Sequence, residues 1–196
     1  MAGKNTGPDD LAIRLALRSM LLDEHVGEAD TVVIEELGLC RGQVRVDVAV
    51  VNGLLHGYEI KSDRDSLRRL RSQVGIYGKV LDQATLVVGN RFLTEGIDIV
   101  PAWWGVIHVR PTLDGLDFRV VRRPRRNAHR DPRLLVELLW SVQAMALLEE
   151  RNVARGVRRK PRRIVWDRVC GHFAIDEIAA AVRTELKARG VNRAPA

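Results

Sequence analysis

The chain has a net charge of +7 and 196 residues. This length is enough for one α/β domain with a sizeable core and too short for two full domains. A hydrophobic fraction of 46%, a polar stretch at residues 1–8 and the lack of any apolar run near the roughly 20 residues of a membrane helix exclude a membrane protein, so we expect a cytoplasmic location and no membrane partner. Two distant cysteines, Cys40 and Cys170, and scattered histidines without an HExxH sequence exclude a disulfide framework and the common zinc motifs, so we expect oxygen ligands for any metal.

The first third of the chain predicts one helix followed by strands. Aspartates at 9–10 precede leucines at helical spacing, so a helix of about four turns begins there. Residues 31–37 are β-branched and then acidic, which fits a strand or a strand ending in a helical turn. Residues 44–51 alternate and then become continuously apolar, as in a strand entering a buried sheet. Asn52-Gly53 is a hairpin signal, so residues 54–61 should return antiparallel to that strand.

The middle of the chain continues the alternation of helix and strand. Ser62 or Asp63 can cap a helix whose apolar residues recur at steps of three and four. Residues 84–89 have the pattern of a buried strand, and residues 103–109 and 116–121 that of a further hairpin. We therefore predict an α/β fold with a mixed central β-sheet flanked by helices.

The C-terminal part of the chain is predicted to be helical. A long helix from Asp131 to about Glu150 is followed by two shorter helical stretches at 164–170 and 176–188. The last two can be read as a helix-turn-helix, although acidic residues in the second would oppose phosphates. The chain accordingly divides into a core of residues 1–127 and a basic helical C-terminal subdomain of residues 128–196.

Arginine accumulates in the second half of the chain. Residues 101–196 contain 20 Lys and Arg against 10 Asp and Glu. Because a guanidinium fork matches phosphate oxygens, we expect a nucleic-acid partner, most simply DNA. The alternative is a solvated basic surface without a polyanionic partner. The side chains predicted to hold the nucleic-acid backbone are Arg64, Arg68, Arg122, Arg123, Arg125, Arg126, Arg158, Arg159 and Lys160.

Two carboxylates and a lysine are predicted to converge in the first hairpin. Glu59 and Lys61 point to the same face of one strand, and the turn at 52–53 brings Asp47 back beside them. Burying such charges without partners would cost several kcal/mol, so a bound cation is implied, with a structural ion pair as the alternative. Mg²⁺ or Mn²⁺ would take Asp47, Glu59 and the backbone carbonyl of Ile60 as ligands. Lys61 would then orient the attacking water or favour its deprotonation.

These residues are similar to the motif of the PD-(D/E)XK nuclease superfamily, in which an Asp precedes Glu/Asp-x-Lys by roughly ten to twenty residues on adjoining strands. Asp47 and Glu59-Ile60-Lys61 match that motif, whereas Val46 stands where the motif has Pro. The resemblance implies a restriction-endonuclease-like core and a third acid ahead of the Asp. Glu36 is preferred for that acid over its neighbour Glu35.

A second element of the resemblance lies in the helix predicted after Lys61. Gln73 and Tyr77 are four residues apart and resemble the Gln-x-x-x-Tyr element of the branch that includes RecB-type exonuclease domains. The resemblance implies that they support the substrate or the acids, and the alternative is a packed Tyr beside an exposed Gln. The wider run, residues 9–110, resembles a small bacterial and phage family within the superfamily, which implies a nuclease fold but names no substrate.

We therefore predict a metal-dependent endonuclease that hydrolyses phosphodiester bonds, with Asp47, Glu59, Lys61 and Glu36 at its centre. One alternative is a non-catalytic module that binds nucleic acid or protein on a nuclease fold. Another is a helix-turn-helix DNA-binding regulator. The sequence leaves open whether the substrate is DNA or RNA, and whether the chain works alone or as a homodimer.

Overall fold

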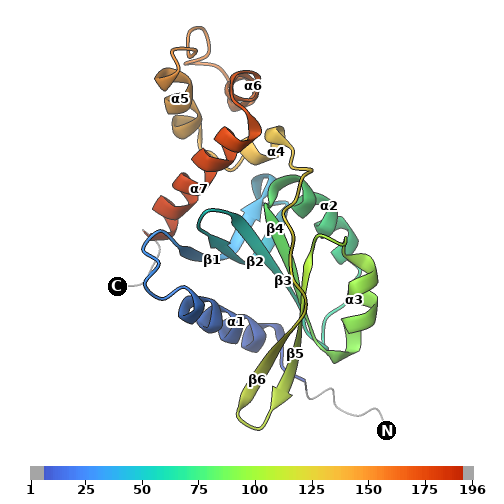
Figure 1. Ribbon diagram of the computed structural model, residues 1–196. Helices are drawn as coiled ribbons and strands as arrows, with labels where there is room; N and C mark the ends of the chain where they lie inside the picture. The colour runs from blue at the N-terminus through green and yellow to red at the C-terminus, as the bar shows by residue number, and fades with distance from the viewer. Residues whose placement is uncertain (1–6, 192–196) are drawn as a thin grey trace.

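The computed structural model describes residues 7–191, and a six-stranded mixed sheet forms its centre (Figure 1). The strands follow one another across the sheet in chain order, so every connection joins neighbours. The first three strands form an antiparallel meander, the third to fifth run parallel, and the sixth is antiparallel to the fifth. The strands are β1 (Val32–Leu39), β2 (Val44–Val51), β3 (Leu55–Lys61), β4 (Gln83–Val88), β5 (Gly105–Thr112) and β6 (Gly115–Arg122).

One face of the sheet is covered by α1 (Asp10–Glu24). The helix starts as its sequence predicts, because the Asp9 side chain accepts a hydrogen bond from the backbone N–H of Ala12 at 2.9 Å. Its apolar positions Ile13, Leu17 and Leu21 are buried together with residues of the sheet, which fixes the helix across the first three strands.

The opposite face carries all the other helices. α2 (Leu70–Val80) lies on it, as does α3 (Leu93–Ile99), which follows the short 3₁₀ turn η2 (Asn90–Phe92). The C-terminal helices are α4 (Pro132–Val136), α5 (Ser141–Glu150), α6 (Arg162–His172) and α7 (Ile175–Val191). Figure 1 shows α5 and α6 at the end of the molecule opposite the β5–β6 hairpin. The expected α/β fold with a mixed sheet, flanking helices and a helical C-terminal region is confirmed.

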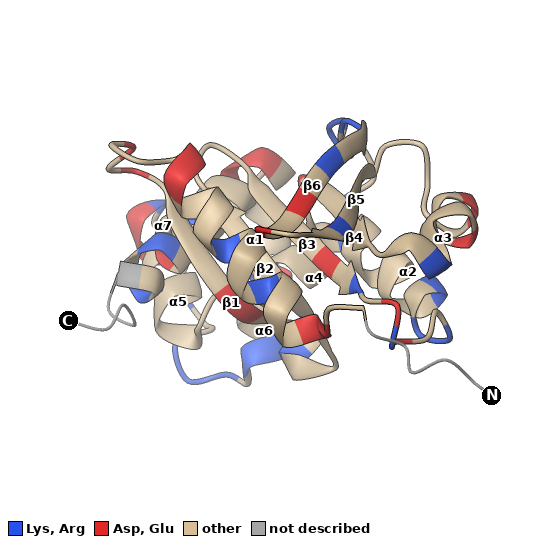
Figure 2. Cartoon of the chain, turned by 90° about the horizontal axis from the view of Figure 1, so that it is seen from below, with Lys and Arg blue, Asp and Glu red and all other residues tan. Residues whose placement is uncertain are grey.

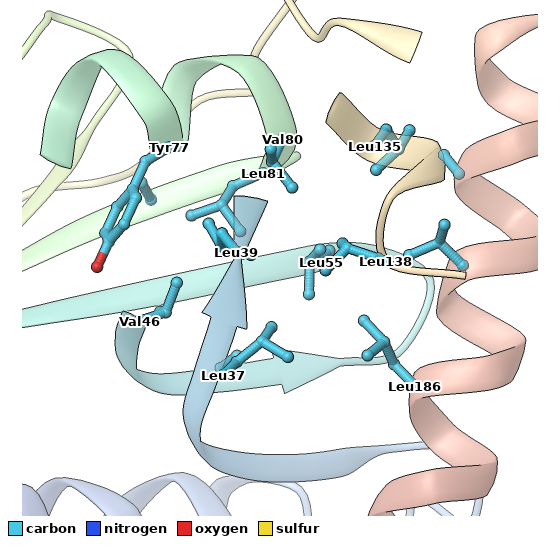
Figure 3. Packing of buried hydrophobic residues seen from close by; sticks show 14 of the residues in the cluster. Leu37, Leu39, Val46, Leu55, Tyr77, Val80, Leu81, Leu135, Leu138 and Leu186 are labelled. Carbon is cyan, nitrogen blue, oxygen red and sulfur yellow. The ribbon is translucent and has the colours of Figure 1, made fainter. Parts of the chain in front are cut away.

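A single apolar cluster joins the sheet to the C-terminal helices. Figure 3 shows Leu37, Leu55 and Val46 of the sheet packing toward α2 and toward Leu186 of α7. Leu186 is only 3% exposed. Burial of this cluster supplies the main driving force for attaching the C-terminal helices. The division of the chain at residue 127 stays a prediction.

No helix in the described part of the chain is long and apolar enough to span a membrane.

Two predicted helices begin or end elsewhere than expected. No helix starts at Ser62 or Asp63: the backbone N–H and the hydroxyl of Ser62 both donate to Asp65 at 2.7 Å, which closes a turn, and α2 begins only at Leu70. The long helix expected from Asp131 is interrupted after Val136. Leu138 and Leu139 turn into the core there, so the chain leaves the helix before α5 begins.

Candidate active site

The candidate site lies where β2 and β3 part from each other. The two strands are paired from Val51 and Leu55 as far as Val48 and Tyr58. Beyond that pair the Asp47 side chain takes the place of a backbone partner, because its Oδ2 accepts a hydrogen bond from the backbone N–H of Ile60 at 2.7 Å. A carboxylate is thereby held at the level of Glu59 and Lys61, as the hairpin predicts.

The backbone of Glu36 explains how a third acid reaches this place. Glu36 has a φ of 54°, in the left-handed region that a residue with a side chain seldom adopts. On one side of it Val33 packs against α1, whereas Leu37 on the other side packs with the α2 face, so the alternation of β1 shifts by one residue there. As a result Glu35 and Glu36 both meet arginines of α1, namely Arg18 and Arg14.

Glu59 is the most deeply buried acid of the site, with 1% of its surface exposed. Its Oε1 accepts hydrogen bonds from Lys61 Nζ at 2.5 Å and from Gln73 Nε2 at 2.6 Å. The Tyr77 hydroxyl lies 2.5 Å from Glu59 Oε2 and 2.7 Å from the carbonyl oxygen of Arg45. The pair Gln73 and Tyr77, predicted one helical turn apart on α2, therefore holds the carboxylate of Glu59 in place.

The electrostatics distinguish Asp47 from its neighbours. Burial raises the pKa of Asp47, the charge of Glu59 raises it further, and the Ile60 N–H and Lys61 lower it, so that it reaches about 7 from an ordinary 3.8. The negative charge of Asp47 is thus incompletely balanced by the protein. Burial and the charge of Glu59 also raise the pKa of Tyr77, which keeps its hydroxyl neutral as a hydrogen-bond donor.

The carboxylates of Asp47 and Glu59 border one cleft of about 570 Å³, which Tyr77 does not line. The predicted residues that line it are Glu36, Asp47, Glu59, Ile60, Lys61 and Gln73. Glu35 does not line it, and its carboxylate lies 2.7 Å from Arg18 Nε of α1. The two adjacent acids thus have different arginine partners on α1, Arg14 for Glu36 and Arg18 for Glu35. The sequence of β1 gives no sign of this difference.

Sequence reasoning missed several residues of the cleft. Asp10 and Arg14 of α1 line it, as do Arg45 of β2 and Arg69 just before α2. Asp10 and Arg14 are one helical turn apart, which is the only sequence signal that they form a pair. No pattern in the neighbouring sequence indicates that the N-terminal part of α1 lies over the junction of β2 and β3.

The predicted nucleic-acid contacts fall into two groups. Arg122 is used inside the fold, because its guanidinium donates to the carbonyl oxygens of Trp104 at 2.7 Å and Pro101 at 3.1 Å. Burial lowers the pKa of Arg122. The other predicted side chains are exposed on three segments, namely Arg64 and Arg68 before α2, Arg123, Arg125 and Arg126 after β6, and Arg158, Arg159 and Lys160 before α6.

The proposed helix-turn-helix pair corresponds to α6 and α7. The first turn of α7 carries Asp176 and Glu177, which form ion pairs with Arg130 at 2.7 Å and with Arg151. These acids bind the protein's own arginines, which gives the start of α7 little free positive charge for a phosphate backbone.

The side chains around the cleft differ in how well they suit a metal ion. Among residues 7–191 no group of three or more His, Cys, Asp and Glu side chains is arranged to hold an ion. The donor chemistry nevertheless suits a hard cation, because carboxylates of Asp47, Glu59 and Glu36 border the same cleft. Glu59 Oε1 already accepts two hydrogen bonds, whereas Oε2 accepts one from Tyr77 and keeps a lone pair for a ligand.

Comparison with known proteins places the chain among phage-related sequences. The family model described as Bacteriophage P4 protein cII matches residues 8–193. Protein cII of Enterobacteria phage P4 is 31% identical over 97 residues, which cover 50% of this chain and 37% of the phage protein. A solved structure of a Silicibacter pomeroyi protein of unknown function covers 76% of this chain and 97% of its own at 23% identity, with a TM-score of 0.44. The expected kinship with phage proteins is confirmed at this level.

Proposed function

We propose that this chain, which belongs to the bacteriophage P4 protein cII family, is a Mg²⁺- or Mn²⁺-dependent nuclease of the PD-(D/E)XK kind that hydrolyses phosphodiester bonds in DNA. The observation that carries the proposal is the meeting of Asp47, Glu59 and Lys61 at one cleft where β2 and β3 separate. Because the phage relative is matched over only 37% of its length, the proposal concerns this chain alone.

The acids of the cleft are the proposed cation ligands. Asp47 and Glu59 would contribute carboxylate oxygens and Ile60 its backbone carbonyl, with Glu36 as the further acid. The raised pKa of Asp47 supports this assignment, since a carboxylate whose charge is poorly balanced gains most from a nearby cation. When bound, the cation would polarise the phosphodiester and make water a better nucleophile.

Lys61 and α2 would complete the chemistry from the protein side. The Lys61 side chain is 8% exposed, and its ammonium lies at the wall of the cleft against Glu59. There it would hold the attacking water by a hydrogen bond and offset negative charge that develops on the phosphate. Gln73 and Tyr77 would fix the orientation of Glu59 throughout.

A basic surface separate from the cleft is the proposed anchor for the nucleic-acid backbone. The loop between α5 and α6 leads into the helix through a run of exposed cationic side chains, and Figure 2 shows this loop as blue over much of its length. Arg158 is 71% exposed and Arg163 is 82% exposed. Such contacts would give affinity without base specificity. The cationic side chains are Arg155, Arg158, Arg159 and Lys160 of the loop and Arg162 and Arg163 in the first turn of α6.

Cleavage tests the proposal directly. Purified protein is incubated with linear, nicked, branched and single-stranded DNA and with RNA, in Mg²⁺ or Mn²⁺. We expect Asp47→Ala and Lys61→Ala to lose at least about a hundredfold in rate while still binding the substrate in a gel-shift assay.

The matched control is Asp117→Ala, which removes an exposed carboxylate of β6 outside the cleft, paired with Arg110 at 2.6 Å. It should cut at the wild-type rate. Cleavage at the wild-type rate by Asp47→Ala or Lys61→Ala would contradict the proposed mechanism.

A non-catalytic binding module is the second candidate, and one observation favours it. Both oxygens of Glu59 already accept hydrogen bonds from the protein, as they would in a purely structural network. Thermal unfolding with added Mn²⁺ separates the two functions. A metal site raises the melting temperature of the wild type and loses that effect in Asp47→Ala, whereas a structural network shows no response in either protein.

A further inference from the structure

Arg14 occupies a position in the cleft that the motif does not assign. It comes from α1, and its two terminal nitrogens reach separate acids. Nη1 donates to Glu36 Oε1, and Nη2 donates to Asp10 Oδ2 at 2.6 Å. Nη2 also lies 3.9 Å from Oδ1 of Asp47, on the oxygen that does not bond Ile60. One guanidinium thus contacts three carboxylates, and its side chain is only 18% exposed.

The charges of the cleft are divided between two cations of the protein. Lys61 pairs with Glu59 and also lowers the pKa of Asp47, whereas Arg14 contacts the three acids on the α1 side. Arg45 Nη1 contacts one of these, Glu36, at 3.0 Å. Arg45 is 65% exposed, so water screens its contribution more strongly than that of Arg14. Arg14 is therefore the less exposed of the two arginines at these acids, and it shares the balancing of the Asp47 charge with Lys61.

We propose that Arg14 is the internal counter-ion of the metal-free cleft and competes with the divalent cation for Asp47 and Glu36. The inference rests on the proposed metal-dependent function, and it adds that the cation enters by exchange with a residue of the protein. A guanidinium does not lose its proton in a protein, so its charge leaves the acids only if the side chain moves.

The contacts of Arg14 supply a path for that exchange. Its distance of 3.9 Å from Asp47 is too long for a hydrogen bond, whereas its bond to Asp10 is short. A cation arriving between Asp47 and Glu59 would repel the guanidinium, which keeps Asp10 as its partner one helical turn away. Its Nε is buried without a hydrogen-bond partner among the described residues, so the side chain has a spare donor.

Competition and simple structural pairing predict different results for Arg14→Gln, which removes the charge and keeps a polar side chain. The melting temperature is measured in EDTA, and the dissociation constant for Mn²⁺ is measured by calorimetry. We expect Arg14→Gln to melt about 5 °C lower than the wild type in EDTA, because three carboxylates lose their counter-ion. At the same time it should bind Mn²⁺ about tenfold more tightly, because the competing charge is gone.

Arg18→Gln is the matched control. Arg18 lies one turn further along α1, pairs with Glu35 at 2.7 Å, is 38% exposed and does not line the cleft. Its replacement should leave the Mn²⁺ affinity unchanged. A lower melting temperature for Arg14→Gln with unchanged or weaker Mn²⁺ binding would overturn the proposal and make Arg14 a structural residue.

The remaining outcomes separate this inference from the proposed function. Mn²⁺ binding by Arg14→Gln but not by the wild type would support the exchange and contradict metal-dependent cleavage by the natural chain. Failure of both proteins to bind Mn²⁺ would overturn both proposals. In a third outcome, Arg14→Gln binds Mn²⁺ more tightly than the wild type, and the wild type binds Mn²⁺ but cuts no substrate. This result would support the exchange and contradict only the proposed nuclease activity.

Discussion

An acid lies beside each end of β3, and the charges of the two acids are balanced differently. At the end near Leu55, Asp82 is 1% exposed, lies 2.7 Å from Arg130 and 3.2 Å from Arg183, and accepts the Leu55 N–H at 2.8 Å. At the other end, Asp47 accepts one backbone N–H and faces a like charge, with its nearest guanidinium at 3.9 Å.

The difference lies in how many partners of opposite charge each carboxylate has within the protein. Asp82 pairs with Arg183 of α7 and with Arg130 of the segment after β6, and it accepts the backbone N–H of Leu55 in β3. The network therefore ties the C-terminal part to the sheet. Asp47 has a raised pKa and borders an open cleft, as expected of a carboxylate whose negative charge is not fully balanced by cations of the protein. Asp82 is the more deeply buried of the two acids and also the more completely compensated.

The largest expected effect on stability comes from breaking the balanced end. Asp82→Ala leaves Arg130 and Arg183 without their buried partner, and such a loss typically costs about 3–5 kcal/mol. Urea unfolding should show this decrease, and the exposed pair Asp117 with Arg110 provides the contrast. Asp117→Ala should cost less than about 1 kcal/mol. Equal effects of the two substitutions would show that Asp82 does not tie the C-terminal part to the sheet.

The unbalanced end should reveal itself in the pH dependence of the metal-free protein. Because the pKa of Asp47 is about 7 when folded against 3.8 ordinarily, its protonated form is favoured by folding. The stabilisation is complete below about pH 4 and is lost as the pH rises through 7. Urea unfolding in EDTA should show the wild type losing on the order of 2–4 kcal/mol over that range relative to Asp47→Asn.

Added Mg²⁺ should act in the opposite sense. A cation favours the carboxylate, so it should restore stability most at pH 8 and least at pH 5. Parallel pH profiles of the wild type and Asp47→Asn in EDTA would contradict the unbalanced charge.

The smallest effect concerns the neighbours Glu35 and Glu36, whose side chains are equally exposed at 38%. Only Glu36 lines the cleft, so Glu36→Gln should change the Mn²⁺ dissociation constant by several-fold while Glu35→Gln leaves it unchanged. Calorimetry on the matched pair measures this. A change of the same size in Glu35→Gln would mean that the cleft acts through bulk charge and not through a particular acid.

Local sequence signals were sufficient where the structure itself is local. Asn52-Gly53 and the alternation on either side of it predict the β2–β3 hairpin, and the hairpin brings Asp47 next to Glu59 and Lys61. The i, i+4 spacing of Gln73 and Tyr77 likewise predicts one face of α2, although their contact with Glu59 depends on how that helix packs. The prediction of a helix start at Ser62 was wrong, because a turn closed by side-chain hydrogen bonds and a helix cap use the same residue types.

The sequence by itself determined the α/β fold class, the mixed sheet and the candidate motif, because strand and helix periods and turn residues act over a few residues. Only the tertiary structure decided that Arg14 and Asp10 join the motif, that Glu36 faces the cleft while Glu35 does not, and that Arg122 serves the fold. Each of these depends on the packing of α1 or β6 against distant strands or on a left-handed backbone at Glu36, and such contacts follow from the balance of the whole core.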